Sequence, residues 1–167
     1  MSDFEAALQA KLARNAELAR EREDAERQMD RVRAEQAEQA RQREIDAQQQ
    51  RRARHGELVE ALGAAAQQLK AASPDDFVVR LGWTESGEEF IAKISTRRLD
   101  PARSLLVELD RDDDEVLARW NSDLGNAIEL WRLLEVSPAL LQELVLQVAD
   151  QQLWRGRSGP PPFPGKQ

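Results

Sequence analysis

The first 72 residues contain no proline and only two glycines, and this lack of helix breakers constrains the fold more than any other feature. Ala, Glu, Gln and Arg dominate the stretch, and these residues lose little side-chain entropy in a helix. Ser2 with Glu5 has the spacing of a capping box, and Ser73-Pro74 supplies a stop. The sequence therefore predicts one helix from about residue 3 to 72, on the order of 100 Å long.

The apolar residues of this predicted helix repeat at heptad spacing in two frames, the second offset by two residues. A coiled-coil oligomer, most simply a parallel homodimer, would remove them from water. The alternatives are a solitary charged helix and an antiparallel hairpin folded near Gly56. Residues 33–57 are rich in Gln and Arg and form the expected weak link. The predicted oligomerisation residues are Phe4, Leu8, Leu18, Met29, Val32, Ile45, Val59, Leu62 and Leu69.

Composition changes at Ser73-Pro74, after which the chain carries all seven prolines and all four tryptophans. Apolar residues alternate with period two in four short stretches, as expected of strands with one buried face. The connections at 84–88 and 111–114 have the character of hairpin turns, which favours an antiparallel meander. The alternating residues are Phe77, Val79, Leu81 and Trp83; Phe90, Ala92 and Ile94; Leu105, Val107 and Leu109; and Val116, Ala118 and Trp120.

Two helices are expected after the strands. Ser122 or Asp123 can cap the first, whose apolar positions would be Leu124, Ala127, Ile128, Trp131 and Leu134. Ser137-Pro138 is a cap followed by proline at the first helical position, and it predicts the second. The apolar positions of that helix are Leu141, Leu144, Val145 and Val148.

These elements predict an α+β protein in three parts. Residues 1–72 form a long coiled-coil helix, and residues 73–154 form a module of a four-stranded antiparallel meander with two helices packed on its aromatic face. The four tryptophans are interpreted as packing residues of that module. Residues 155–167 form a disordered, proline-rich tail, in which Pro160 to Pro164 favours polyproline II and Phe163 is the one apolar anchor for a docking partner.

The outward face of the meander carries one apolar residue on each strand, flanked by charges of both signs. Such a patch usually marks a contact. Either the end of the long helix covers it through Leu58, Val59, Leu62 and Leu69, or a second subunit or another protein does. The candidate docking residues are Val78, Arg80, Ile91, Lys93, Leu106, Leu117 and Arg119, with Phe163 of the tail.

The sequence contains few motifs typical of catalytic, metal-binding or nucleic-acid-binding sites. The chain has no cysteine and one histidine, which excludes disulfides, thiolate metal sites and multi-histidine sites. The acidic run from Asp110 to Glu115 departs from a calcium-binding loop and is interpreted as a solvated turn. We find no catalytic set and no cofactor motif. One basic cluster suggests nucleic-acid binding, and it consists of Arg51, Arg52 and Arg54 with His55. The net charge of −7 disfavours that function.

No apolar run is long enough to span a bilayer, and no signal peptide is expected, so we expect a cytoplasmic protein. The expected function is that of a non-enzymatic scaffold or adaptor that oligomerises through its N-terminal helix and docks another protein through its module. The first alternative is a nucleic-acid-associated accessory factor that uses the arginine cluster. The second is a ligand-binding or enzymatic module with an unrecognised site.

Overall fold

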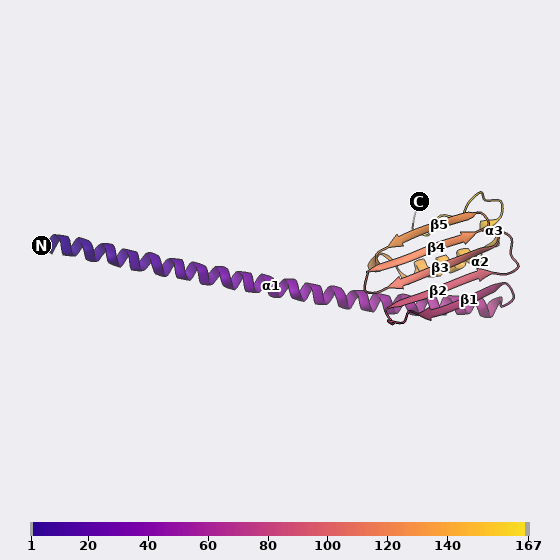
Figure 1. The fold of residues 1–167 in the computed structure, drawn as a ribbon, viewed down its shortest axis with the longest axis horizontal. Coiled ribbons are helices and arrows are strands. Elements are labelled where there is room, and N and C mark those ends of the chain that lie inside the picture. Colours follow the sequence, from indigo (N-terminus) through magenta and orange to yellow (C-terminus); the bar gives the residue numbers. More distant parts are fainter. Residues whose placement is uncertain (1, 166–167) are drawn as a thin grey trace. The chain divides into compact units, whose positions relative to one another are not determined.

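The computed structural model describes residues 2–165 and has an α+β fold (Figure 1). One long helix, α1 (Ser2–Ala72), precedes the strands β1 (Phe77–Trp83), β2 (Glu89–Thr96), β3 (Arg103–Asp110), β4 (Glu115–Ser122) and β5 (Gly125–Trp131). A short 3-10 turn (Leu133–Glu135) leads to the helices α2 (Pro138–Ala149) and α3 (Gln151–Trp154). The single N-terminal helix is thus confirmed, and because α1 continues through Gly56, a hairpin folded there is wrong.

Contacts divide the described chain into two units, which we call the N-terminal segment (residues 2–47) and the module (residues 48–165). The sequence placed the boundary at residue 73. Residues 48–72 of α1 belong to the module instead, because Leu58, Leu62 and Ala66 are fully buried in its core. The module therefore contains a helical segment that the sequence assigned to the long coiled-coil helix.

The sheet is an antiparallel meander with strand order β1-β2-β3-β4-β5. The four alternating stretches are strands, and their turns fall at residues 84–88 and 111–114, as predicted. Within residues 2–165 the sheet has five strands, so the prediction of four was one short.

The fifth strand replaces the helix expected after Ser122. The Ser122 hydroxyl donates to the carbonyl of Gly125 (2.7 Å) and accepts from the amide of Leu124 (3.1 Å), which makes a tight turn rather than a helix cap. Gly125 has φ +124°, a conformation that other residues rarely adopt. The chain then returns along β4 and satisfies its open edge, from Ser122 opposite Gly125 to Val116 opposite Trp131.

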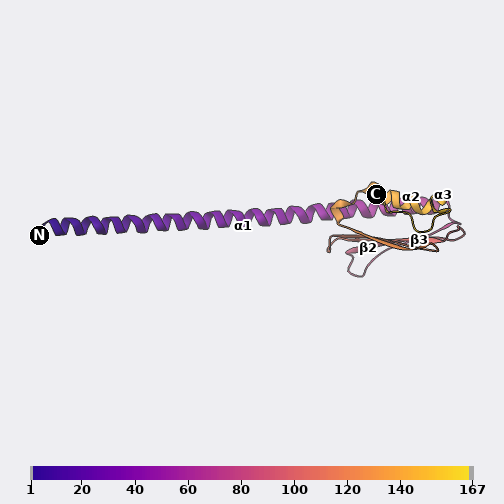
Figure 2. The ribbon, with the colours of Figure 1, turned by 90° about the horizontal axis from the view of Figure 1, so that it is seen from above.

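All three helices of the module lie on one face of the sheet (Figure 2). The core between the layers contains the aromatic face of the strands, residues 58–66 of α1 and the apolar side of α2. The alternative in which the end of the long helix covers the outward face is therefore wrong, because that helix shares the inward face with α2. The outward face of the sheet, which we call the open face, carries no helix within residues 48–165.

Ser137 caps α2 as predicted, since its hydroxyl accepts from the amide of Leu140 (3.2 Å) and Pro138 follows it. At the other end of α2, the buried Arg103 donates from Nε (3.0 Å) and Nη2 (2.8 Å) to the carbonyl of Val148. A cation suits the carbonyl end of a helix because the unpaired carbonyls there are partly negative. These contacts fix α2 over the sheet.

The C-terminal tail packs on the module, and the prediction of disorder is wrong for residues 155–165. Phe163 is only 7% exposed and lies against Trp120 and Trp131, with ring centroids 6.1 and 6.0 Å apart. The side-chain amide of Gln147 donates to the carbonyl of Pro162 (3.1 Å). The tail folds because the aromatic end of the sheet offers Phe163 an apolar surface that local sequence does not reveal.

None of the helices in residues 2–165 is both long enough and apolar enough to cross a membrane.

Candidate functional site

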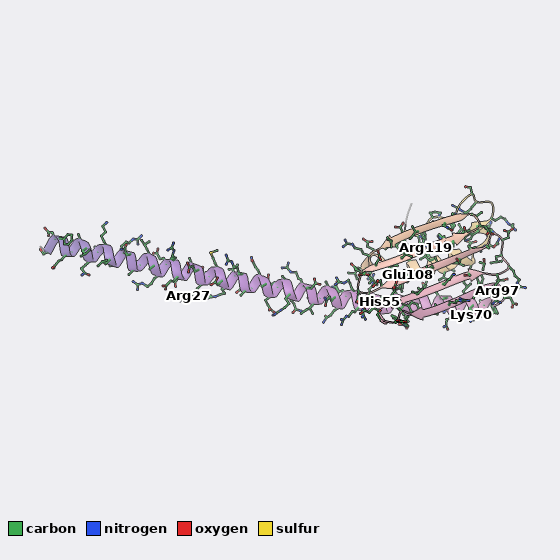
Figure 3. The ribbon with its side chains drawn as sticks, in the orientation of Figure 1. Arg27, His55, Lys70, Arg97, Glu108 and Arg119 are labelled. Carbon is green, nitrogen blue, oxygen red and sulfur yellow. The ribbon has the colours of Figure 1, made fainter. Side chains whose placement is uncertain are left out.

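The open face is the main exposed surface of the module that combines apolar and charged side chains. Alternation along each strand sends every second side chain to this face, away from the core. Figure 3 looks onto it and labels Glu108 on β3 and Arg119 on β4. Its aliphatic residues are half-buried or exposed, and Ile128 and Leu130 are 54% and 51% exposed. The aliphatic residues are Val78, Ile91, Leu106, Leu117, Ile128 and Leu130.

Strand register sorts the side chains of the open face into rows that cross the sheet. The polar row consists of Ser95, Ser104, Asn121 and Asn126, with the aliphatic Val78 at its β1 end. Next comes the cationic row, which crosses the sheet in the order Arg80, Lys93, Leu106, Arg119 and Ile128. The central row consists of Ile91, Glu108, Leu117 and Leu130. The acidic row consists of Glu89, Asp110 and Glu115.

The two charged rows place like charges directly opposite one another, which destabilises a sheet. Arg80 faces Lys93, and Asp110 faces Glu89. Burial raises the pKa of Glu89 above its ordinary value, and the neighbouring Glu108 carboxylate raises that pKa further. Ion pairs do not offset the repulsion in the cationic row, because Arg80, Lys93 and Arg119 form none with any described residue.

The structure brings together seven of the eight predicted docking residues on the open face. They are Val78, Arg80, Ile91, Lys93, Leu106, Leu117 and Arg119. Phe163 is buried in the core and is not available as a docking anchor. Sequence reasoning missed Ile128 and Leu130, which it assigned to a helix core. The turn at Ser122 to Gly125 and the alternation that follows it are the signals that could have found them.

The N-terminal segment is the second candidate surface. Every residue from 2 to 46 is exposed, and Phe4 and Met29 are 63% and 57% exposed. Arg27, labelled in Figure 3, pairs with Glu23 at i, i+4 with 3.6 Å between guanidinium and carboxylate. Such exposed pairs contribute only about 0.3–0.5 kcal/mol. The predicted oligomerisation residues exposed on this segment are Phe4, Leu8, Leu18, Met29, Val32 and Ile45.

The remaining predicted oligomerisation residues lie inside the module. Leu62 is fully buried, and Val59 and Leu69 are half-buried against the core. These three therefore do not form a seam with a second chain, and that part of the prediction is wrong. The heptad pattern located the apolar side of the helix, but the sheet of the same chain covers it.

The basic cluster is partly used within the module. Arg54 donates from Nη1 to the carbonyls of Leu134 (3.2 Å) and Val136 (2.7 Å). His55 is 4% exposed and donates from Nε2 to the carbonyl of Leu109 (2.9 Å), while its ring lies 5.8 Å from that of Trp83. These contacts join α1 to the sheet and to the 3-10 turn, which gives both residues a packing role.

The carboxylates of the acidic turn after β3 accept hydrogen bonds from backbone amides. The Asp110 carboxylate accepts from the amides of Asp112 (3.1 Å) and Asp113 (3.2 Å), and that of Asp114 accepts from the amide of Leu133 (3.2 Å). Within residues 2–165, no three His, Cys, Asp or Glu side chains are grouped so that they could hold a metal ion.

A shallow groove runs between α1 and α2 on the side away from the sheet. Ala61, Ala65 and Leu69 form one wall, and Val145 and Leu146 form part of the other. Leu146 is 66% exposed. Two glutamines and two further alanines complete the lining, which contains no charged side chain, so the groove offers a mainly apolar contact without a charge that would orient a ligand.

Comparison with known proteins gives no match to a family model, to a curated protein or to a solved structure.

Proposed function

We propose that the chain is a non-enzymatic scaffold or adaptor of the cytoplasm. Its N-terminal segment pairs with the same segment of a second copy, and its module docks a protein through the open face. In this function the helix sets valency, because pairing presents two copies of one docking face. Two linked faces bind with an avidity that exceeds the affinity of either one.

The observation that carries this proposal is the exposure of every residue from 2 to 46. A globular helix is stabilised mainly by burying an apolar stripe. Here Leu18, Met29 and Val32 are 46%, 57% and 50% exposed, although they share one heptad frame. Fully burying such a side chain contributes about 1.5–3 kcal/mol, so a second helix along this stripe would stabilise the segment substantially.

The test is the mass of the full-length chain in solution. A single copy has a mass of 18.9 kDa, and we expect at least twice that value by light scattering coupled to chromatography. The triple variant L18D/M29D/V32D places three charges in the stripe and should reduce association at least tenfold. Its matched control is A13D/A34D/A37D, which adds the same charge on the other side of the helix at a helix-propensity cost that is no smaller, because alanine is the strongest helix former.

Cysteine cross-linking locates the contact independently, because the chain has no cysteine of its own. In a parallel pair, oxidation should join two chains of the L18C variant and leave A13C chains unjoined. A wild-type chain of 18.9 kDa at high micromolar concentration would overturn the scaffold proposal.

A further inference from the structure

We infer that the partner of the open face is a second copy of the same module, packed face to face about a two-fold axis. The inference rests on the proposed function, in which this face docks a protein, and it names that protein. The helices occupy the opposite face of the sheet, so the open face is free to meet another sheet (Figure 2).

The order of the rows makes the face complementary to itself. Consider a two-fold axis that lies parallel to the rows and midway between the cationic row and the central row. Rotation about this axis places each strand of one copy opposite the same strand of the other copy, and the two strands run in opposite directions. The cationic row of one copy then meets the central row of the other, and the acidic row meets the polar row.

The most specific contact, between opposite charges, lies at the centre of this arrangement. Glu108 of the second copy lies over Leu106, because Leu106 and Glu108 belong to the same strand, one row apart. Lys93 and Arg119 flank Leu106 on the neighbouring strands. The carboxylate therefore reaches two cations that have no ion pair within their own chain, and symmetry makes this contact twice.

The outer rows are also compatible. The carboxylates of the acidic row face serine hydroxyls and asparagine amides, which can donate hydrogen bonds to them. Ile128 meets Leu130 of the second copy at the β5 side of the face. The like charges that lie opposite one another within each chain do not meet like charges across the interface.

The size of the face suits a modest interface. Five strands about 4.8 Å apart and about seven residues at about 3.4 Å give roughly 24 by 24 Å, or about 570 Å² on each copy. Both copies together bury about 1,100 Å², near the lower end for a specific contact. Packed sheets differ by about 30° in strand direction, so the match is best at the centre, where Glu108 and Arg119 lie.

The test uses the full-length L18D/M29D/V32D chain, in which pairing of the N-terminal segment is suppressed. We expect this chain to dimerise at micromolar concentration in sedimentation velocity, and its dissociation constant should rise with salt. Adding E108R or R119E should each weaken the dimer at least tenfold. The control R97E changes an exposed arginine in the link between β2 and β3, off the face, and should leave the dimer unchanged.

An equimolar mixture of the E108R and R119E chains gives the decisive test of face-to-face pairing. In the mixed two-fold pair, the arginine introduced at position 108 of one chain meets the glutamate introduced at position 119 of the other. The symmetry-related contact keeps the native Glu108 and Arg119, so the mixed pair should associate at least tenfold more tightly than either variant alone. Circular dichroism confirms that both variants are folded. A mixture no tighter than its components overturns the inference.

A triple-aspartate chain that stays at 18.9 kDa also overturns it, while pairing of the N-terminal segment in the wild-type chain would leave the scaffold proposal standing. If both results are observed, the open face is assigned to a different protein.

Discussion

The two parts of α1 belong to one continuous helix and have opposite surroundings. Residues 48–72 bury His55, Leu58, Leu62 and Ala66 within the module, whereas no residue from 2 to 46 is even half-buried. The difference shows that a heptad-like pattern marks which side of a helix needs a partner and leaves open what that partner is. For residues 48–72 the partner is the sheet of the same chain.

The largest effect should come from removing a buried leucine of the second part. Leu62→Ala should destabilise the module by about 4 kcal/mol, because it removes a fully buried side chain and leaves a cavity. The melting temperature, followed by the fluorescence of the four tryptophans, should fall by on the order of 10 °C. Leu12→Ala, at an exposed leucine outside the predicted oligomerisation residues, is the control, and a comparable fall in that variant would contradict the distinction between the two parts.

A smaller effect tests whether the tail belongs to the module. Phe163→Ala should cost about 3 kcal/mol, because the ring packs between Trp120 and Trp131. Pro162→Ala, at an exposed neighbour, keeps the backbone carbonyl that accepts from Gln147 and should be nearly neutral. Equal melting temperatures for F163A and the wild type would return the tail to the disordered state expected from its sequence.

The smallest effect concerns the charge arrangement of the open face. Glu89→Gln removes a carboxylate whose pKa is raised by burial and by Glu108. Since the folded state disfavours the charged form, the variant should be more stable at pH 7, by no more than ~0.5 kcal/mol at such a position.

The gain in E89Q should disappear as the pH falls through the raised pKa toward the ordinary value of 4.5, because the wild-type carboxyl then becomes neutral as well. Glu143→Gln on the exposed side of α2 is the control. A gain in E89Q that does not depend on pH would show that charge is not its cause.

Much of the fold follows from local pattern. The period-two stretches and their turns located β1 to β4, and Ser137-Pro138 located the start of α2. Seven of the residues placed on the outward face lie there because alternation alone decides the side to which a strand residue points. Pattern failed at β5, where apolar residues at positions 124, 127, 128, 131 and 134 matched a helix. The open edge of β4 and the turn at Gly125 made that segment a strand.

The sequence by itself determined which residues are helical or extended in most of the chain and which side of each element is apolar, because these depend on neighbouring residues along the chain. Tertiary structure decided which surfaces meet: that residues 48–72 share the inward face with α2, and that Phe163 closes the aromatic end of the core. Burial depends on what other segments of the chain present in space, and an apolar stripe is satisfied equally well by any complementary surface.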